Sequence, residues 1–164
     1  MSVAGRENTE RAVIIEKNSQ ALLERVRLIQ NAKDEIILST FAFKSDESGK
    51  LILGALYDAA DRGVHVRILV DGMESWIDME GNPYFYGLSS HENVEIKLYN
   101  KANPLKPWKT MGRMHDKYLI ADGKIYILGG RNTYNYFLGD FPGHKNFDRD
   151  VLVVCDEPIF SYVV

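Results

Sequence analysis

Six residues between positions 115 and 132 have types and spacing that suit the cleavage of a phosphodiester. The stretch reads HDKYLIADGKIYILGGRN, with the spacing H-x-K-x4-D-x6-G-G-x-N starting at His115. His115 and Lys117 are two residues apart at the start of an expected strand, so their side chains point to the same face. Asn132 follows the paired strand, and the flexible Gly129 and Gly130 allow it to return to the same end of the sheet. The pattern therefore predicts an imidazole, an ammonium and an amide at one point.

These three groups can act on phosphorus without a metal ion. A histidine can attack phosphorus and leave a covalent phosphohistidine, while an ammonium and an amide donor stabilise the charge on the non-bridging oxygens. Taken singly, a histidine or a lysine near a strand is usually structural, and Gly-Gly is usually a turn. All six positions together would arise by chance in a chain of this length on the order of once in a million sequences. The motif therefore indicates function.

The rest of the chain alternates between apolar, strand-like runs and helix-like segments. Strands are expected at 12–16, 35–43, 65–71, 94–99, 117–121, 124–128 and 150–155. Helices are expected from a cap at Asn18 or Ser19 to about residue 29, at 48–62 and at 83–91. Asp122 and Gly123 between two strands are a strong hairpin signal, which makes the sheet mixed. We predict an α/β domain whose mixed sheet is flanked by helices on both faces.

The two ends of the chain differ from this pattern. Residues 1–11 are polar and are expected to be a tail, with residues 12–164 forming a single domain that carries one motif. Asp156, Glu157 and Pro158 form a good helix start, yet only six residues, 159–164, follow it. This pattern predicts that the domain is truncated at its C-terminal end.

The motif resembles the HKD motif of the phospholipase D superfamily, and the sequence around it resembles bacterial cardiolipin synthase-like proteins. The similar stretches include AKDEIILSTFAF, DAADRGVHVRILVDG, HENVEIKLYN and FDRDVLV. Together with the motif they cover nearly the whole chain from about Val13 to Pro158. The resemblance implies a phospholipase D-type domain that needs no cofactor. It also implies phosphatidyl transfer or phospholipid hydrolysis through a phosphohistidine.

The resemblance assigns a role to each matched residue. His115 matches the nucleophile, or the general acid and base, and Lys117 and Asn132 match the phosphate-binding pair. Asp122 matches the motif aspartate, which in this family is more structural than catalytic. Asp148 falls where the family places a carboxylate that orients the histidine through its other ring nitrogen, fixing the tautomer and stabilising the imidazolium.

Two positions leave alternatives open. Asp150 is an alternative to Asp148 as the carboxylate that orients the histidine, because the two residues would face the same side of a strand. Gly130 stands where many single-motif nucleases of the superfamily have serine, whereas Gly-Gly is more typical of the first motif in the cardiolipin synthase-like branch. The resemblance thus favours an N-terminal half, with Gly129 and Gly130 beside the substrate. The second HKD motif would come from a missing C-terminal domain or from a second subunit.

A basic segment precedes the motif. Five cations and no acidic residue occur between positions 97 and 113: Lys97, Lys101, Lys106, Lys109 and Arg113. A local basic patch suits an anionic substrate, and we expect Lys109 and Arg113 to bind it. The interleaved Trp108 and Met111 suit a lipid surface. The alternative is a solvated loop whose tryptophan packs back on the domain.

The overall composition argues against several classes of protein and of site. The net charge of −3 and pI of about 5.8 argue against a protein that coats nucleic acid. The single cysteine, Cys155, excludes an internal disulfide and a Cys-based zinc site. No apolar run approaches the ~18 residues of a membrane span. We therefore expect no anchor in this chain, and a location that is peripheral to a membrane or on the cytoplasmic face of a bacterial membrane.

These expectations favour a cardiolipin synthase-like enzyme that acts on anionic phospholipid at a membrane surface, with little activity in the isolated chain. Two alternatives stay open. One is a metal-independent nuclease of the same superfamily, and the other is a half-domain that binds phosphate without turnover.

Overall fold

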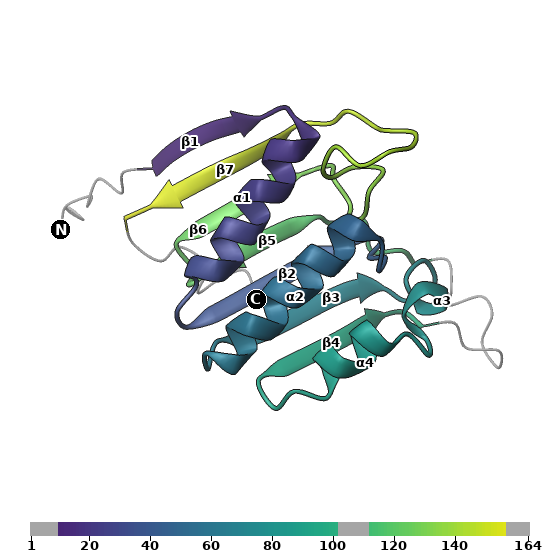
Figure 1. Cartoon of the computed structure of the whole chain (residues 1–164). Coiled ribbons are helices and arrows are strands. Elements are labelled where there is room, and N and C mark those ends of the chain that lie inside the picture. The colour runs from purple at the N-terminus through teal and green to yellow at the C-terminus, as the bar shows by residue number, and fades with distance from the viewer. Residues whose placement is uncertain (1–9, 102–111, 157–164) are drawn as a thin grey trace.

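A computed structural model of the chain describes residues 10–101 and 112–156 (Figure 1). In this part of the chain the strands are β1 (Glu10–Ile15), β2 (Glu35–Thr40), β3 (His65–Asp71), β4 (Val94–Tyr99), β5 (Tyr118–Ala121), β6 (Ile125–Gly129) and β7 (Asp150–Cys155). The helices are α1 (Asn18–Asn31), α2 (Glu47–Asp61), α3 (Trp76–Met79) and α4 (Pro83–Ser89). None of these helices combines the length and apolar character that crossing a bilayer requires.

The strands form one sheet in the order β1-β7-β6-β5-β2-β3-β4. β2, β3 and β4 pair in parallel, whereas β5, β6 and β7 lie between β2 and β1 through antiparallel pairings. The predicted α/β domain with a mixed sheet is therefore confirmed. Since β1, β6, β2, β3 and β4 all run in one direction, their carboxyl ends lie at one end of the sheet, together with the starts of β5 and β7.

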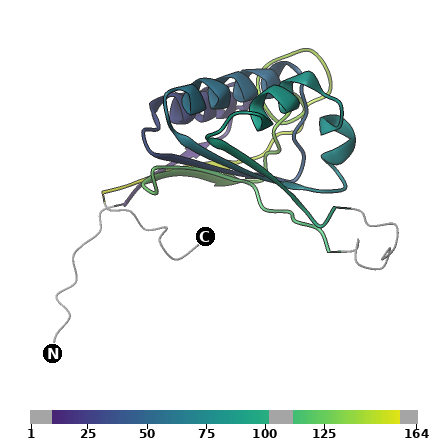
Figure 2. The same ribbon diagram turned by 90° about the horizontal axis from the view of Figure 1, so that it is seen from below.

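The helices cover only one face of the sheet. Figure 2 shows α1, α2 and α4 together on that face, and no helix of the described part lies on the other, so the expected cover on both faces is corrected. The reason is the direction of the crossovers. From β1 to β2, β3 and β4 the chain always advances the same way across the sheet, and right-handed connections then place every helix on the same side.

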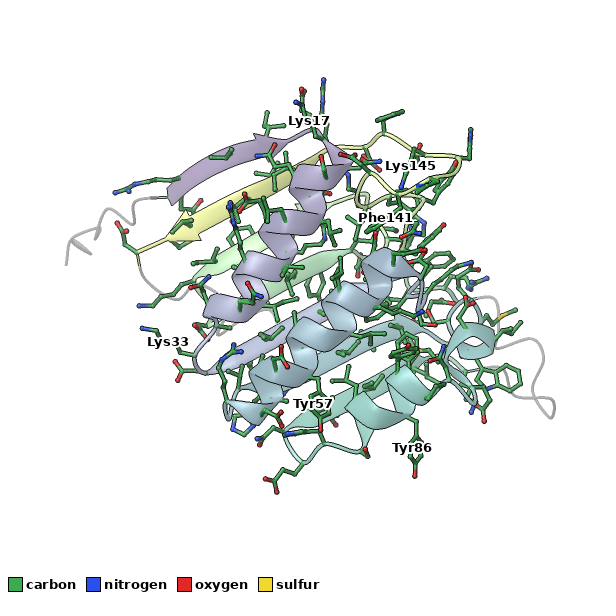
Figure 3. All side chains as sticks on the ribbon, in the orientation of Figure 1. Lys17, Lys33, Tyr57, Tyr86, Phe141 and Lys145 are labelled. Carbon is green, nitrogen blue, oxygen red and sulfur yellow. The ribbon has the colours of Figure 1, made fainter. Side chains whose placement is uncertain are left out.

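The main core lies between this helix layer and the sheet. Alternate residues of β2 and β3 point into it, and the apolar stripes of α1, α2 and α4 close it from above. Its fully buried members include Ile36, Leu38, Val66, Ile68, Val70, Ile29, Ile52, Leu56 and Leu88. Burial of each such side chain contributes about 1.5–3 kcal/mol. Tyr57 lies at the outer surface of this layer between α2 and α4, and Tyr86 projects from α4 away from the body (Figure 3).

Element bounds agree closely with the sequence prediction, with four main differences, of which the first is that β2 ends at Thr40 and not at Phe43. The N-cap of α1 is Lys17, not Asn18 or Ser19, because Asn18 is buried and donates to the carbonyl of Asn146 at 2.8 Å. β1 begins at Glu10, inside the segment expected to be a tail, and α3 was not predicted. The predicted C-terminal helix start beyond residue 156, and the middle of the basic segment, lie outside the described residues.

The β5–β6 hairpin turns at Asp122 and Gly123, which have φ values of 53° and 64°. Asp and Gly tolerate this left-handed region better than most residues, as the hairpin signal requires. The Asp122 carboxylate also accepts hydrogen bonds from the backbone N–H groups of Lys33, Asp34 and Glu35 at 2.8–3.2 Å. The motif aspartate therefore ties the hairpin to the loop between α1 and β2.

Candidate active site

The motif residues gather at the sheet end where β2, β3 and β6 finish and β5 begins. His115 and Lys117 lie just before β5, and Asn132 lies just after β6. The two strands pair as a hairpin, with Tyr118 opposite Leu128, so their open ends are held side by side. The structure thus places all three residues at the same end of the sheet.

His115 is exposed, and its ring is available for reaction. The imidazole packs against the ring of Phe41, with a centroid distance of 5.0 Å and an interplanar angle of 57°. Among the described residues, no hydrogen bond is made by either ring nitrogen. A ring supported on one face, with both nitrogens open, can attack an electrophile or move a proton.

Lys117 is only 8% exposed, and its ammonium donates to the backbone carbonyl of His115 at 2.6 Å. Burial lowers the pKa of Lys117, and the nearby charges of Asp116 and Asp148 only partly offset this effect. A poorly solvated ammonium at this end of the sheet gains more from a phosphate oxygen than one in open water does.

Asn132 is buried and fixed by the chain on both sides. Its Oδ1 accepts from the N–H of Ala42 at 3.2 Å. The following residue, Thr133, forms a parallel bridge with Phe43 and exchanges backbone hydrogen bonds with Ala42 and Lys44. Since Oδ1 is used in this way, the amide is oriented, and its NH₂ group donates no hydrogen bond to the described residues.

Asp148 does not orient His115 in this structure. Its carboxylate accepts from the N–H of Arg149 at 2.7 Å and makes no hydrogen bond to the imidazole. Its backbone carbonyl accepts from the guanidinium of Arg131, which fixes the chain so that the carboxylate lies over Gly130. Asp148 acts on the site through charge, because it favours the protonated form of Lys117.

Asp150, the alternative to Asp148, is also not near the imidazole. It is fully buried and pairs with Arg25 at 2.9 Å and with Arg131 at 3.2 Å, which places it in the core under α1. Asp122 directly follows β5 and so lies at the opposite end of that strand from Lys117, which fits the more structural role that the resemblance implies for it. Both carboxylates are structural in this fold.

Neither Gly129 nor Gly130 has a positive φ, so backbone conformation does not require glycine at these positions. Glycine is required because a larger side chain would not fit. A Cβ on Gly129 would collide with the carboxylate of Asp150, and a Cβ on Gly130 would collide with that of Asp148. The conformational freedom expected of this pair is therefore not what positions Asn132. A serine at position 130 would require the Asp148 side chain to move.

Of the two basic residues expected to bind substrate, Lys109 lies outside the described residues and Arg113 is held by Asp71. The guanidinium of Arg113 forms hydrogen bonds to the Asp71 carboxylate at 2.9–3.1 Å, and the N–H of Met114 adds another at 3.1 Å. Asp71 is 1% exposed. It therefore fixes the segment that leads into His115.

Sequence reasoning missed three residues that build the site: Phe41, Asp71 and Arg131. Asp71 gave a usable signal, since it is a charged residue at the carboxyl end of a buried strand. Phe41 gave no such signal, because a single aromatic residue after a strand is common. Arg131 gave none either, because it occupies a position that the motif leaves unspecified. No three His, Cys, Asp or Glu side chains converge as metal ligands within the described ranges.

The Asp71 contact predicts a pH dependence of stability. Burial alone would raise the pKa of Asp71, but hydrogen bonds from Arg113 and from backbone N–H groups outweigh it, so the pKa lies below the ordinary 3.8. A lowered pKa gives stability that is present above 3.8 and is lost as the pH falls through the folded value. Asp71→Asn should therefore cost about 1.5–3 kcal/mol at neutral pH, and this cost should vanish in acid.

Urea unfolding of both proteins across this pH range measures the effect. The exposed Asp58→Asn variant is the matched control and should follow the parent at every pH. A constant difference between Asp71→Asn and the parent down to strongly acidic pH would contradict the assignment.

Comparisons with known proteins show the family and the fold of the chain. The family model described as "Cardiolipin synthase, PLD-like domain" matches residues 26–160. An uncharacterized protein of Helicobacter pylori (strain ATCC 700392 / 26695) is 35% identical over 158 residues, which cover 88% of this chain and 30% of that protein. Cardiolipin synthase C of Escherichia coli (strain K12) is 29% identical over 154 residues, covering 85% of this chain and 31% of the synthase.

Among solved structures, the phospholipase D family member Nuc from Salmonella typhimurium shares the fold. Its TM-score is 0.60 at 22% identity, covering 90% of this chain and 84% of that one. The chain spans only about 30% of the length of its curated relatives. The match over residues 26–160 shows that the chain belongs to the phospholipase D-like family of the cardiolipin synthases.

Proposed function

We propose that this chain supplies one histidine half of a phospholipase D-type active site, in which His115 forms a phosphohistidine with an anionic phospholipid. One observation carries the proposal. The exposed imidazole has no hydrogen bond from its ring nitrogens to the described residues, and it lies at the same sheet end as the buried ammonium of Lys117 and the oriented amide of Asn132.

The chemistry follows from these groups. A ring nitrogen of His115 forms a bond to phosphorus as the bond from phosphorus to the leaving oxygen breaks. Lys117 and the NH₂ group of Asn132 stabilise the charge on the non-bridging oxygens. An alkoxide leaving group needs a proton at the same moment, which requires a second acid. An alcohol or water then takes the phosphoryl group from the histidine.

Three facts support a second histidine from elsewhere and a lipid substrate. The only H-x-K sequence in the chain is His115-Asp116-Lys117, and the chain spans about 30% of its relatives' length. One relative at 29% identity is named cardiolipin synthase C. In the proposed reaction an anionic glycerophospholipid is the donor at a membrane surface, and an alcohol is the acceptor.

The experiment uses a leaving group that needs no proton. In excess EDTA, the purified chain should react with bis(p-nitrophenyl) phosphate and release one p-nitrophenolate per molecule in a burst. Peptide mass spectrometry after an alkaline quench should find the phosphoryl adduct on His115. The same chain should release no glycerol from phosphatidylglycerol vesicles, because that alkoxide lacks its proton donor.

Competition separates lipid from nucleic acid. A short-chain phosphatidylglycerol should slow the burst at lower concentration than a dithymidine phosphodiester does, and the reverse order would favour a nuclease. If inorganic phosphate binds but no adduct forms, the chain is a phosphate-binding half-domain. If EDTA stops the burst and one metal restores it, the metal-free mechanism is wrong.

A further inference from the structure

The ring of Phe41 is the common neighbour of three groups at the site. Besides His115 at 5.0 Å, the guanidinium carbon of Arg113 lies 4.9 Å from its centroid, and the ammonium nitrogen of Lys117 lies 5.5 Å from it. Phe41 directly follows β2, so the sheet fixes its position. Two cations and the reactive imidazole therefore converge on one aromatic ring.

Buried polar side chains fix Phe41 and the segment that carries Arg113 by hydrogen bonds. The hydroxyl of Ser75, which is fully buried, donates to the carbonyl of Phe41 at 3.1 Å. Asp71 fixes Arg113, and Met114 is held by the hydroxyl of Ser39 at 3.2 Å. The ring and the groups around it thus have little freedom to move apart.

An aromatic face attracts positive charge because of its quadrupole. When one imidazole nitrogen attacks phosphorus while the other still carries a proton, the ring becomes a cation. Carboxylates serve this purpose in other histidine sites, but here Asp148 bonds to the N–H of Arg149 and makes no hydrogen bond to the imidazole. The ring of Phe41, whose centroid lies 5.0 Å from that of the imidazole, is close enough to interact with this charge.

We propose that Phe41 is a positioning residue of the phosphohistidine reaction. Its ring holds the imidazole of His115 in the reactive orientation, keeps the ammonium of Lys117 close to that imidazole, and favours the cation that forms on attack. This inference rests on the proposed function of His115. Phe41 directly follows β2 and lies outside the motif of residues 115–132, so the motif alone does not predict this role.

The test measures the burst with bis(p-nitrophenyl) phosphate and, separately, the binding of inorganic phosphate by titration calorimetry. Phe41→Leu should slow the burst rate constant about tenfold and weaken phosphate binding severalfold. Phe41→Tyr keeps the aromatic face and should stay within about threefold of the parent. Pentafluorophenylalanine at position 41 keeps the shape but reverses the face charge, so it should be slow.

Tyr57→Leu is the matched control. Tyr57, on the helix layer (Figure 3), packs edge-on against the ring of His91 with a centroid distance of 5.5 Å, which is also a contact between an aromatic ring and an imidazole. This variant should react and bind phosphate like the parent. Urea unfolding of every variant separates an effect on the site from loss of structure, and the tyrosine and pentafluorophenylalanine proteins keep the test decisive if leucine unfolds the chain.

Two results would overturn the inference. One is a parental burst rate in the pentafluorophenylalanine protein, which would leave Phe41 as a packing residue. The other is a tyrosine variant as slow as leucine. The phosphate titration distinguishes the two proposals. If no adduct forms but the Phe41 series still orders phosphate affinity, the proposed function fails and the cation-gathering role of Phe41 stands.

Discussion

His115→Asn should abolish the p-nitrophenolate burst and the covalent adduct, with a loss of at least about a thousandfold in rate. Asparagine is polar and of similar reach, but its amide does not attack phosphorus. The imidazole is exposed and contacts Phe41 without hydrogen bonds to the described residues, so the fold loses little. We expect the free energy of unfolding to change by less than about 1 kcal/mol.

Stopped-flow absorbance gives the rate, and urea unfolding gives the stability. His65→Asn is the matched control, because His65 is an exposed histidine on β3 outside the site. It should leave the burst unchanged. If His115→Asn retained more than a few per cent of the burst rate, the nucleophile would be another residue.

Asp150→Asn should be the most destabilising single change in the supporting structure, at about 3–5 kcal/mol. Asp150 is fully buried and neutralises Arg25 and Arg131, which are themselves 5% and 1% exposed. Asparagine keeps the shape and removes the charge, so two guanidinium groups stay buried without an anion. A total stability of about 5–15 kcal/mol is usual for a domain, so this loss is large.

The Asp150→Asn substitution should also weaken phosphate binding at the candidate active site. The Arg131 guanidinium donates to carbonyl groups of Ile15, Glu16 and Asp148, and Arg131 is bonded directly to Asn132. Phosphate affinity should therefore fall in Asp150→Asn even in the fraction that stays folded.

Urea unfolding and phosphate titration measure both effects. The control is Arg149→Ala, which removes an ion pair with Glu16 whose side chains are 76% and 64% exposed, and which should cost less than about 1 kcal/mol. Equal costs for the two variants would show that the buried charges find other partners.

The sequence was sufficient to place His115, Lys117 and Asn132 at one end of the sheet, because the hairpin that they flank is local. Lys117 and Asn132 flank paired strands, and the turn between those strands is encoded by adjacent residues. Asp148 and Asp150 could not be told apart in this way. Alternation says only that they share a strand face, whereas their partners, Arg131 and Arg25, come from distant segments.

The layer arrangement also needed information beyond local pattern. β2 is apolar along most of its length and reads as a strand covered on both sides. Which face the helices occupy depends on the direction in which the crossovers advance, and that requires the strand order. Phe41 depends on this order too, since it meets His115 only because β5 pairs with β2.

The pairing of β1 with β7 has a consequence for the order in which the molecule assembles. Adjacent strands such as β5 and β6 can pair as a hairpin within microseconds. β1 can pair with β7 only after the intervening chain has been made, because Glu10 pairs with Cys155. Contacts so distant in sequence slow folding. On the ribosome, β1 emerges before the other strands of this sheet and remains unpaired until β7 is made. Arg131 likewise emerges before its partner Asp150, so the β5–β6 hairpin is made before the ion pair that anchors the residue after it.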